Sequence, residues 1–236
     1  MIIRKEIESL AKWIKEANSI VILTGAGAST ESGIPDFRSQ GGIYESENPL
    51  FRKTLENDYQ GFYDFCMKFF HQFRDCQPNQ VHKLIAKWEK EGLVDVVITQ
   101  NVDNLHQKAG SKNVIELHGT METASCITCE ESAPIEDFFD KKPCHICDGR
   151  LRPNIVLFGD PLPQDELNRA FKLSQEADLY IVIGSSLEVM PANQLPFLSN
   201  AKKVLINKES IHQIADFDLF LKGSAGEIMN NLKKTI

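Results

Sequence analysis

Short runs of apolar residues, each bounded by turn-forming residues, recur along the chain. They lie at residues 19–23, 94–98, 114–117, 155–158, 179–183 and 204–206, with a last one at 219–221. Apolar positions at helical spacing precede the first run at 7–17 and separate later runs at 81–88 and 167–174. Unbroken apolar strands that alternate with helices are typical of parallel sheets covered on both faces. The pattern therefore predicts an α/β fold with a mostly parallel sheet.

Two stretches break this alternation. Residues 44–77 are rich in Phe and Tyr, and phenylalanines recur there at helical spacing. Residues 122–152 contain two close pairs of cysteines. We expect these stretches to form a smaller domain beside the sheet domain, with a cleft between them. The expected sheet domain comprises residues 1–40, 78–121 and 153–236, and the smaller domain comprises a helical insert at 41–77 and a cysteine ribbon at 122–152.

Composition and charge narrow the classes of function. The 236 residues include 42% hydrophobic and 25% charged residues, which is average for a globular protein. The net charge of −7 argues against binding nucleic acid or an anionic membrane through the overall field, and it is compatible with a basic peptide partner. Charges interrupt the first six residues, and no stretch is long and apolar enough to cross a bilayer. We therefore expect a cytoplasmic protein that binds neither membrane nor nucleic acid.

Four of the six cysteines have the spacing of metal ligands. Cys126 and Cys129 are separated by two residues, and so are Cys144 and Cys147. Each gap lets both sulfurs of a pair reach one ion, and four thiolates complete a tetrahedral zinc shell. The alternative interpretation is that these cysteines are free thiols or a redox pair. Because four cysteines leave no position for water, the predicted zinc ion is structural rather than catalytic.

A glycine turn follows the first predicted strand. Two glycines separated by one small residue, Gly25-Ala26-Gly27, let backbone N–H groups approach a pyrophosphate closely. Turns of small residues after strands are common, so this motif alone is a weak sign of nucleotide binding. The acidic ribose ligand that usually follows about twenty residues later is missing. An ordinary hydride-transferring dehydrogenase is therefore disfavoured.

Polar residues follow three later strands. Gln100, Asn101 and Asp103 come after the run at 94–98, His118 comes after 114–117, and the small residues 184–186 come after 179–183. Ligands gather at the carboxyl ends of the strands in open parallel sheets. Each segment also has a structural alternative. The residues after 94–98 could form an Asx-rich helix cap, His118 could be a structural histidine, and residues 184–186 could be a plain turn.

Taken together and in this order, these segments resemble the sirtuins, a family of NAD-dependent protein lysine deacylases. The resemblance covers nearly the whole chain. It rests on residues 25–29, 32–38, 99–103, 118–119, the two cysteine pairs, and residues 152–156, 158–159 and 184–186. Departures are few, and one of them, Asp160 where many members have glutamate, bears on peptide contacts.

The resemblance implies a Rossmann-type sheet domain and a small domain with a zinc ribbon, with NAD and acyl-lysine entering the cleft from opposite sides. The implied NAD-binding residues are Gly25, Ala26, Gly27, Thr30, Asp36, Phe37, Arg38, Gln100, Asn101, Val102, Asp103, His118, Gly184, Ser185, Ser186, Asn207, Ala225 and Gly226. Val156, Phe158 and Gly159 would line the tunnel for the lysine stem and pair with the peptide backbone.

The resemblance also implies catalytic roles. His118 would take a proton from the ribose hydroxyls as a general base. Asn101 would orient the ribose and an ordered water, and Asp103 would accept a hydrogen bond from the nicotinamide amide. Nicotinamide would be a leaving group, and Phe37 would shield the reactive ribose carbon.

The expected function is that of an NAD-dependent protein lysine deacetylase, which transfers acetyl from lysine to ADP-ribose. Two alternatives remain: transfer of ADP-ribose to protein at the same site, or a catalytically silent NAD-sensing adaptor. In the desuccinylating branch of the family a tyrosine and an arginine three residues later bind the acyl carboxylate. The matching positions here are predicted to be Tyr63 and Cys66, which favours acetyl over succinyl. The sequence does not identify the protein substrate or the oligomeric state.

Overall fold

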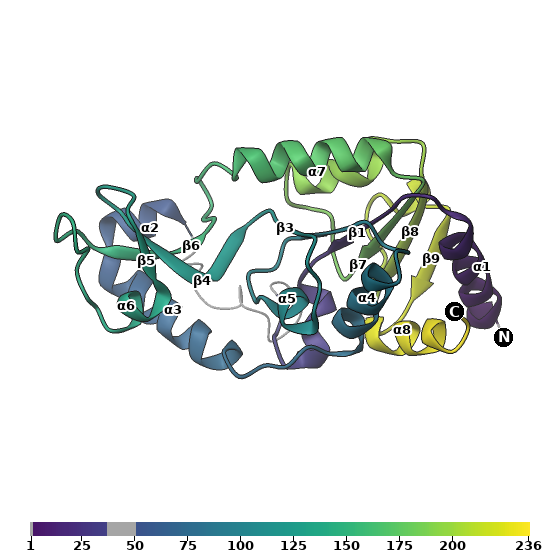
Figure 1. Ribbon diagram of the computed structural model, residues 1–236, viewed down its shortest axis with the longest axis horizontal. Coiled ribbons are helices and arrows are strands. Elements are labelled where there is room, and N and C mark those ends of the chain that lie inside the picture. The colour runs from purple at the N-terminus through teal and green to yellow at the C-terminus, as the bar shows by residue number, and fades with distance from the viewer. Residues whose placement is uncertain (1, 37–50) are drawn as a thin grey trace.

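The structure is a computed structural model that describes residues 2–36 and 51–236 (Figure 1). Its main feature is a six-stranded sheet in the order β3-β2-β1-β7-β8-β9, in which every neighbouring pair is parallel. The strands are β1 Ile20–Thr24, β2 Val96–Thr99, β3 Val114–Glu116, β7 Leu179–Ile183, β8 Lys202–Asn207 and β9 Leu219–Lys222. All residues of β1, β2 and β7 are buried, so these strands carry apolar side chains toward both faces.

Helices cover both faces of this sheet. Ile20 and Ile22 of β1 pack in one core with helices α1 Ile2–Glu16, α4 Gln80–Lys90 and α8 Ala225–Lys233. The alternate residues Val21 and Leu23 pack in a second core with α7 Gln164–Glu176 and the 3-10 helix η4 Ala192–Phe197. Figure 1 shows α7 along one side of the sheet and α4 and α8 on the other. The predicted α/β class and the covered parallel sheet are confirmed.

A second, smaller body has its own sheet and its own core. Its antiparallel sheet has the order β5-β4-β6, with β4 Gly119–Cys126, β5 Ser132–Pro134 and β6 Leu151–Ile155. Helices α2 Arg52–Asn57, α3 Tyr59–Phe73 and α6 Ile135–Phe139 accompany it, and Phe62, Phe69 and Phe73 of α3 lie in its core. The predicted aromatic helix is thus confirmed. The short helix α5 Leu105–Ala109 follows β2.

The apolar run at 155–158 does not form the expected strand. The strand β6 ends at Ile155, and it belongs to the small antiparallel sheet. Beyond it, the backbone amide of Val156 donates to the carbonyl oxygen of His118 at 2.8 Å. The chain then turns back between Leu157 and Asp160. The run is apolar because Leu157 enters the core of the smaller body. Among the described helices, none is long and apolar enough to cross a membrane.

The loops that follow β1 and β7 touch through their backbones. The amide of Gly25 donates to Ile183 O at 3.0 Å, and the amide of Gly27 donates to Gly184 O at 2.9 Å. A Cβ on Gly184 would overlap the backbone of Gly27 and Ala28. These amides therefore serve the contact between the loops, and glycine is required because a side chain would separate them.

We predict that Gly184→Ala lowers the free energy of unfolding by about 2–4 kcal/mol. The loss has two causes: Gly184 has a positive φ, and the added Cβ would overlap the backbone of the opposite loop. The control is Gly92→Ala, because Gly92 also has a positive φ, 75°, but has nothing within 4 Å of the added Cβ. That variant should lose only about 1 kcal/mol in urea unfolding. Equal losses in the two variants would contradict the close contact.

Candidate active site

A cavity of about 1020 Å³ lies between the carboxyl edge of the parallel sheet and the smaller body. Most residues of the expected NAD site line it: Gly25, Ala26, Gly27, Thr30, Asp36, Gln100, Asn101, Val102, Asp103, His118, Gly184, Ser185, Ser186, Asn207 and Ala225. Val156, Phe158 and Gly159 line the same cavity. The structure therefore brings the residues expected for NAD and for acyl-lysine to one site.

Three expected residues are not placed there. Gly226 is not among the lining residues; its amide, in the first turn of α8, donates to Glu31 Oε1 at 2.9 Å. Ser224 donates to the same carboxylate, so Glu31 caps this helix. Phe37 and Arg38 lie outside the described residues.

His118 has a defined tautomer. Its Nδ1 lies 3.0 Å from the carbonyl oxygen of Gln100, and a carbonyl can only accept a hydrogen bond, so Nδ1 carries the proton. The other ring nitrogen, Nε2, is then an acceptor. Burial lowers the pKa of His118 below its ordinary value, and the bond to Gln100 opposes this in part. His118 is therefore neutral at pH 7 and has a basic nitrogen available to a ligand.

Ser29 joins the two polar residues that follow β2. Its Oγ donates to Asp103 Oδ2 at 2.6 Å and accepts from Asn101 Nδ2 at 3.1 Å. Asn101 Nδ2 also donates to Gly25 O at 3.1 Å, so its two hydrogens are used within the protein. The amide can then meet a ligand through its oxygen. Ser29 is not among the expected site residues, although it lies in the glycine motif of residues 25–29.

Asp103 is held by donors on both oxygens. Besides the bond from Ser29, the amide of Leu105 donates to Oδ1 at 3.0 Å. Burial raises the pKa of Asp103, and these two hydrogen bonds oppose that shift because they favour the carboxylate. The side chain thus presents a fixed acceptor at the wall of the cavity.

Two buried histidines, His82 and His106, lie next to Ser29 and to each other. His82 Nδ1 accepts from the amide of Asn79 at 3.3 Å, so Nε2 carries the proton and faces Ser29 Oγ at 3.4 Å. The ring of His106 lies 4.8 Å from that of His82, and its Nε2 lies 2.9 Å from Thr24 Oγ1. Burial lowers the pKa of His82 to about 4 and that of His106 well below its ordinary value. Both rings are therefore neutral at pH 7.

The apolar end of the cavity corrects one expectation. Cys66 is buried in the core of the smaller body, and the hydroxyl of Tyr63 donates to Phe139 O at 2.6 Å. Neither residue lines the cavity. Phe69 and Phe73, one and two turns further along α3, line it instead and pack edge to face with ring centroids 4.1 Å apart. The structure therefore does not bring Tyr63 and Cys66 to the cavity wall, where they were expected to meet the acyl group.

The four paired cysteines form one cluster. Their sulfur atoms all lie within 4.8 Å of one another, and neighbouring sulfurs such as Cys129 and Cys147 are 3.4 Å apart. A tetrahedron with zinc–sulfur bonds of about 2.3 Å has edges of about 3.8 Å, so the cluster fits zinc. Amides of Thr128 and Ile146 donate to two of the sulfurs.

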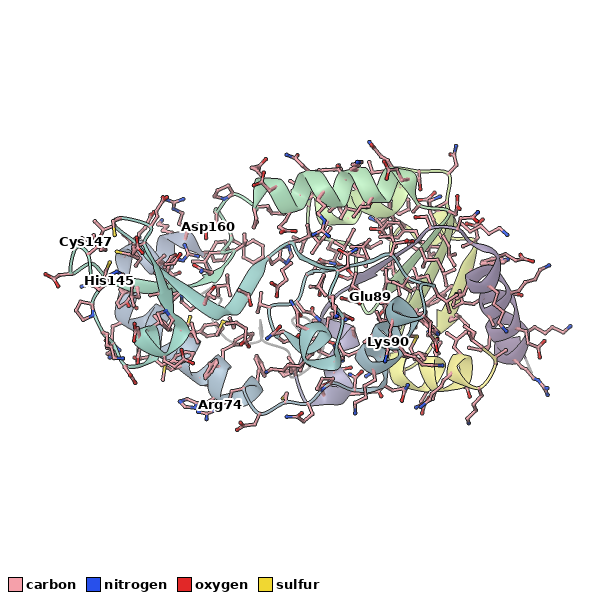
Figure 2. All side chains as sticks on the ribbon, in the orientation of Figure 1. Arg74, Glu89, Lys90, His145, Cys147 and Asp160 are labelled. Atoms are coloured by element: carbon pink, nitrogen blue, oxygen red, sulfur yellow. The ribbon has the colours of Figure 1, made fainter. Side chains whose placement is uncertain are left out.

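The cysteine cluster is remote from the cavity. None of its four residues is a lining residue, and Figure 2 shows Cys147 and His145 at the far tip of the small sheet. The expectation of structural zinc agrees with this position.

We predict that Cys126→Ser releases zinc and lowers the melting temperature, because structural zinc contributes directly to the folding free energy. Zinc per chain and thermal unfolding are measured on the same preparation. Cys76→Ser is the matched control, since Cys76 lies outside the cluster. Native protein without zinc, or a variant that keeps both zinc and stability, would contradict the assignment.

The buried histidines predict a pH dependence of stability. In the unfolded chain His82 has its ordinary pKa of 6.5, whereas burial lowers its pKa in the folded protein to about 4. The unfolded state therefore binds the proton first, and the free energy of unfolding decreases by about 3 kcal/mol as the pH falls from above 6.5 to below 4. His82→Gln should reduce this loss in urea unfolding between pH 7 and pH 4.5. The control His71→Gln, at an exposed position on α3, should leave the slope unchanged. Equal slopes for wild type and His82→Gln would refute this account.

Comparison with known proteins gives the family. The model of the Sir2 family matches residues 25–191. NAD-dependent protein deacetylase 1 of Geobacillus kaustophilus is 41% identical over 237 residues, which cover 97% of this chain and 98% of the relative.

Solved structures agree along nearly the whole chain. A Sir2 variant with a deacetylated p53 peptide and 3′-O-acetyl ADP-ribose has a TM-score of 0.93 and 38% identity, with 97% of both chains covered. A complex of Sir2 with p53 peptide and NAD+ has a TM-score of 0.90 and 40% identity, with 96% of both chains covered. The chain therefore belongs to the Sir2 family.

Proposed function

We propose that the protein is an NAD-dependent protein lysine deacetylase. The observation that carries the proposal is that His118, whose Nε2 is unprotonated, lines the same cavity as the glycine turn after β1 and the apolar residues Val156 and Phe158. In this proposal residues 1–40, 78–121 and 153–236 hold NAD, and residues 41–77 and 122–152 form the small domain that completes the acyl-lysine site.

The residues at the carboxyl edge of the sheet act on NAD. NAD supplies an ADP-ribosyl group with nicotinamide as its leaving group. His118 accepts a proton from a ribose hydroxyl, Asn101 orients that ribose through its amide oxygen, and Asp103 accepts from the carboxamide of nicotinamide. Gln100 fixes the adjoining loop because its amide donates to Ser185 Oγ at 2.8 Å.

The apolar end of the cavity suits the acyl-lysine. Phe69 and Phe73 from α3 and Phe158 from the turn after β6 line it with aromatic carbon, which would exclude water from the reacting groups. Gly159 has a φ of 100° and leaves room for a peptide backbone to pair alongside. We propose that the partner is an acetylated lysine in a protein or peptide.

The relatives support this assignment. The Geobacillus protein is named a protein deacetylase, and the two Sir2 complexes contain p53 peptide with NAD+ or with 3′-O-acetyl ADP-ribose. The direct test is nicotinamide release from NAD with and without an acetylated peptide. Release that depends on the peptide, together with loss of acetyl mass from it, supports deacetylation, whereas a gain of ADP-ribose mass would support transferase activity instead.

We predict that His118→Ala keeps the fold and the affinity for NAD but slows deacetylation at least about 100-fold, because it removes the general base. Since burial lowers the pKa of His118, kcat/KM of the wild type should stay high down to pH 6.5 and fall only at lower pH. His71→Ala, at an exposed position on α3, is the control. Near-normal turnover in His118→Ala would show that this histidine is only structural.

A further inference from the structure

The cavity wall beyond Val156 is a turn closed by a carboxylate. Asp160 Oδ2 accepts from the amide of Leu157 at 3.1 Å, and the amide of Asp160 donates back to Leu157 O at 2.9 Å. Phe158 and Gly159 lie between these two residues, at the tip of the turn. The conformation of the tip therefore depends on the Asp160 side chain as well as on the backbone.

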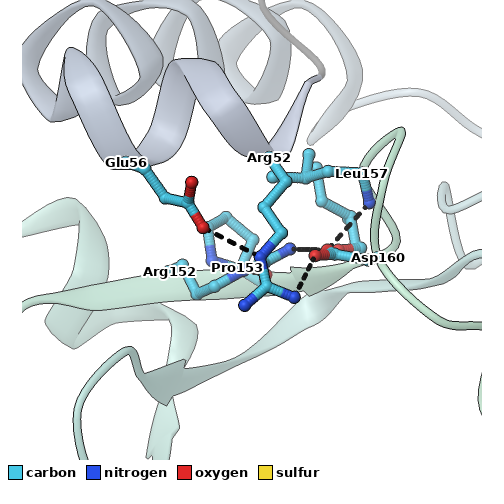
Figure 3. A network of polar contacts seen from close by, with 7 residues as sticks. Arg52, Glu56, Arg152, Pro153, Leu157 and Asp160 are labelled. Carbon is cyan, nitrogen blue, oxygen red and sulfur yellow. Dashed lines mark hydrogen bonds and ion pairs between the residues drawn. The ribbon is translucent and has the colours of Figure 1, made fainter.

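Arg152 anchors that carboxylate to the small sheet. Its Nη2 donates to Asp160 Oδ2 at 2.7 Å and to Ile155 O at 2.6 Å, so one guanidinium bridges the end of β6 and the turn (Figure 3). The Arg152 and Asp160 side chains are only 17% and 10% exposed. A hydrogen-bonded pair this buried is screened little by solvent, and it constrains the turn strongly.

Helix α2 holds the turn from the other side. Arg52 Nη1 lies 3.7 Å from Asp160 Oδ1, and the backbone amide of Arg52 donates to Phe158 O at 3.0 Å. The rings of Phe51 and Phe158 lie 5.2 Å apart. The Arg52 side chain is 53% exposed and also pairs with Glu56 at 3.0 Å. Its ion pair with Asp160 is therefore weaker than that of Arg152.

The turn is also tied to the catalytic segment. The amide of Val156 donates to the carbonyl oxygen of His118 at 2.8 Å. A change in the turn thus shifts the peptide wall relative to His118. Because Asp160 accepts hydrogen bonds from Leu157 and Arg152 and forms an ion pair with Arg52, its charge is balanced within the protein rather than by a substrate cation.

We propose that Asp160 is a positioning residue for the acyl-lysine peptide, which it serves by holding the turn at 157–160 through Leu157, Arg152 and Arg52. This inference rests on the proposed function, since it assumes that acyl-lysine binds along the turn. Asp160 should therefore affect the affinity for the peptide and leave the affinity for NAD unchanged.

The test is Asp160→Asn, which keeps the shape of the side chain but removes its charge. The neutral amide has one acceptor oxygen and places an NH2 group toward an arginine. We expect KM for an acetylated peptide to rise about 10-fold or more, with KM for NAD changed less than about twofold. Fluorescence anisotropy with a labelled acetyl-lysine peptide should show the same loss of affinity without any turnover.

Three further variants separate positioning from general damage. Asp160→Glu restores a carboxylate and should return the peptide KM to within about threefold of wild type. Arg52→Gln should raise it about two- to threefold, because the pair it breaks is half exposed. Glu56→Gln is the matched control, since it removes the exposed partner of Arg52 and leaves the turn contacts in place; it should match wild type.

Several outcomes would overturn the inference. These are a peptide KM within twofold of wild type in Asp160→Asn, equal losses for peptide and NAD, or no recovery in Asp160→Glu. If Asp160→Asn does not fold, Arg52→Gln decides: a peptide KM equal to that of wild type, or equal losses for peptide and NAD, overturns the inference. A wild type that neither binds nor deacetylates any acetylated peptide would overturn the proposed function itself, whereas an active wild type with an unaffected Asp160→Asn overturns only the role of Asp160.

Discussion

The direct backbone contact between the loops after β1 and β7 determines the arrangement of the site. It needs glycine on both sides, because added Cβ atoms on Gly27 or Gly184 would overlap the opposite loop. Since β2 pairs with β1 on its other edge, the polar residues that follow β2 emerge beside this contact. Asn101 then reaches Gly25 O and Gln100 reaches Ser185, so the loops and the polar side chains fix one another.

Behind that edge, burial keeps His82 and His106 uncharged. His82 and His106 are buried, and burial lowers the pKa of each, so both rings are neutral. The neutral ring of His82 faces Ser29 Oγ, which donates to Asp103. His118 is neutral for the same reason, but it lines the cavity. Hydrogen bonds from Ser29 and Leu105 thus fix the acceptor on Asp103, while burial keeps His118 a free base within the same site. This combination suits proton removal from a bound hydroxyl at neutral pH.

Much of this could be predicted from the sequence, since local patterns decide it. Apolar runs identify strands buried on both faces, the paired spacing of Cys126 and Cys129 identifies a metal ligand set, and polar residues after strands identify the carboxyl edge. The remainder depends on contacts between distant residues. Ser29 meets His82 only in the folded chain, and the apolar run at 155–158 is a turn wall because Asp160 bonds back to Leu157. Helical periodicity shows that Cys66 is on a buried face of α3, but not whether that face meets the core or the cavity.

The central claim is that one cavity joins NAD to acyl-lysine, so that nicotinamide release and acetyl transfer are parts of one reaction. The most direct measurement quantifies nicotinamide, deacetylated peptide and O-acetyl-ADP-ribose by mass spectrometry in the same reaction of the zinc-loaded protein with NAD and an acetylated peptide. The account predicts equal amounts of the three products at every time point. Deacetylated peptide accompanied by free acetate without nicotinamide, or nicotinamide released with ADP-ribose attached to the peptide, would contradict it.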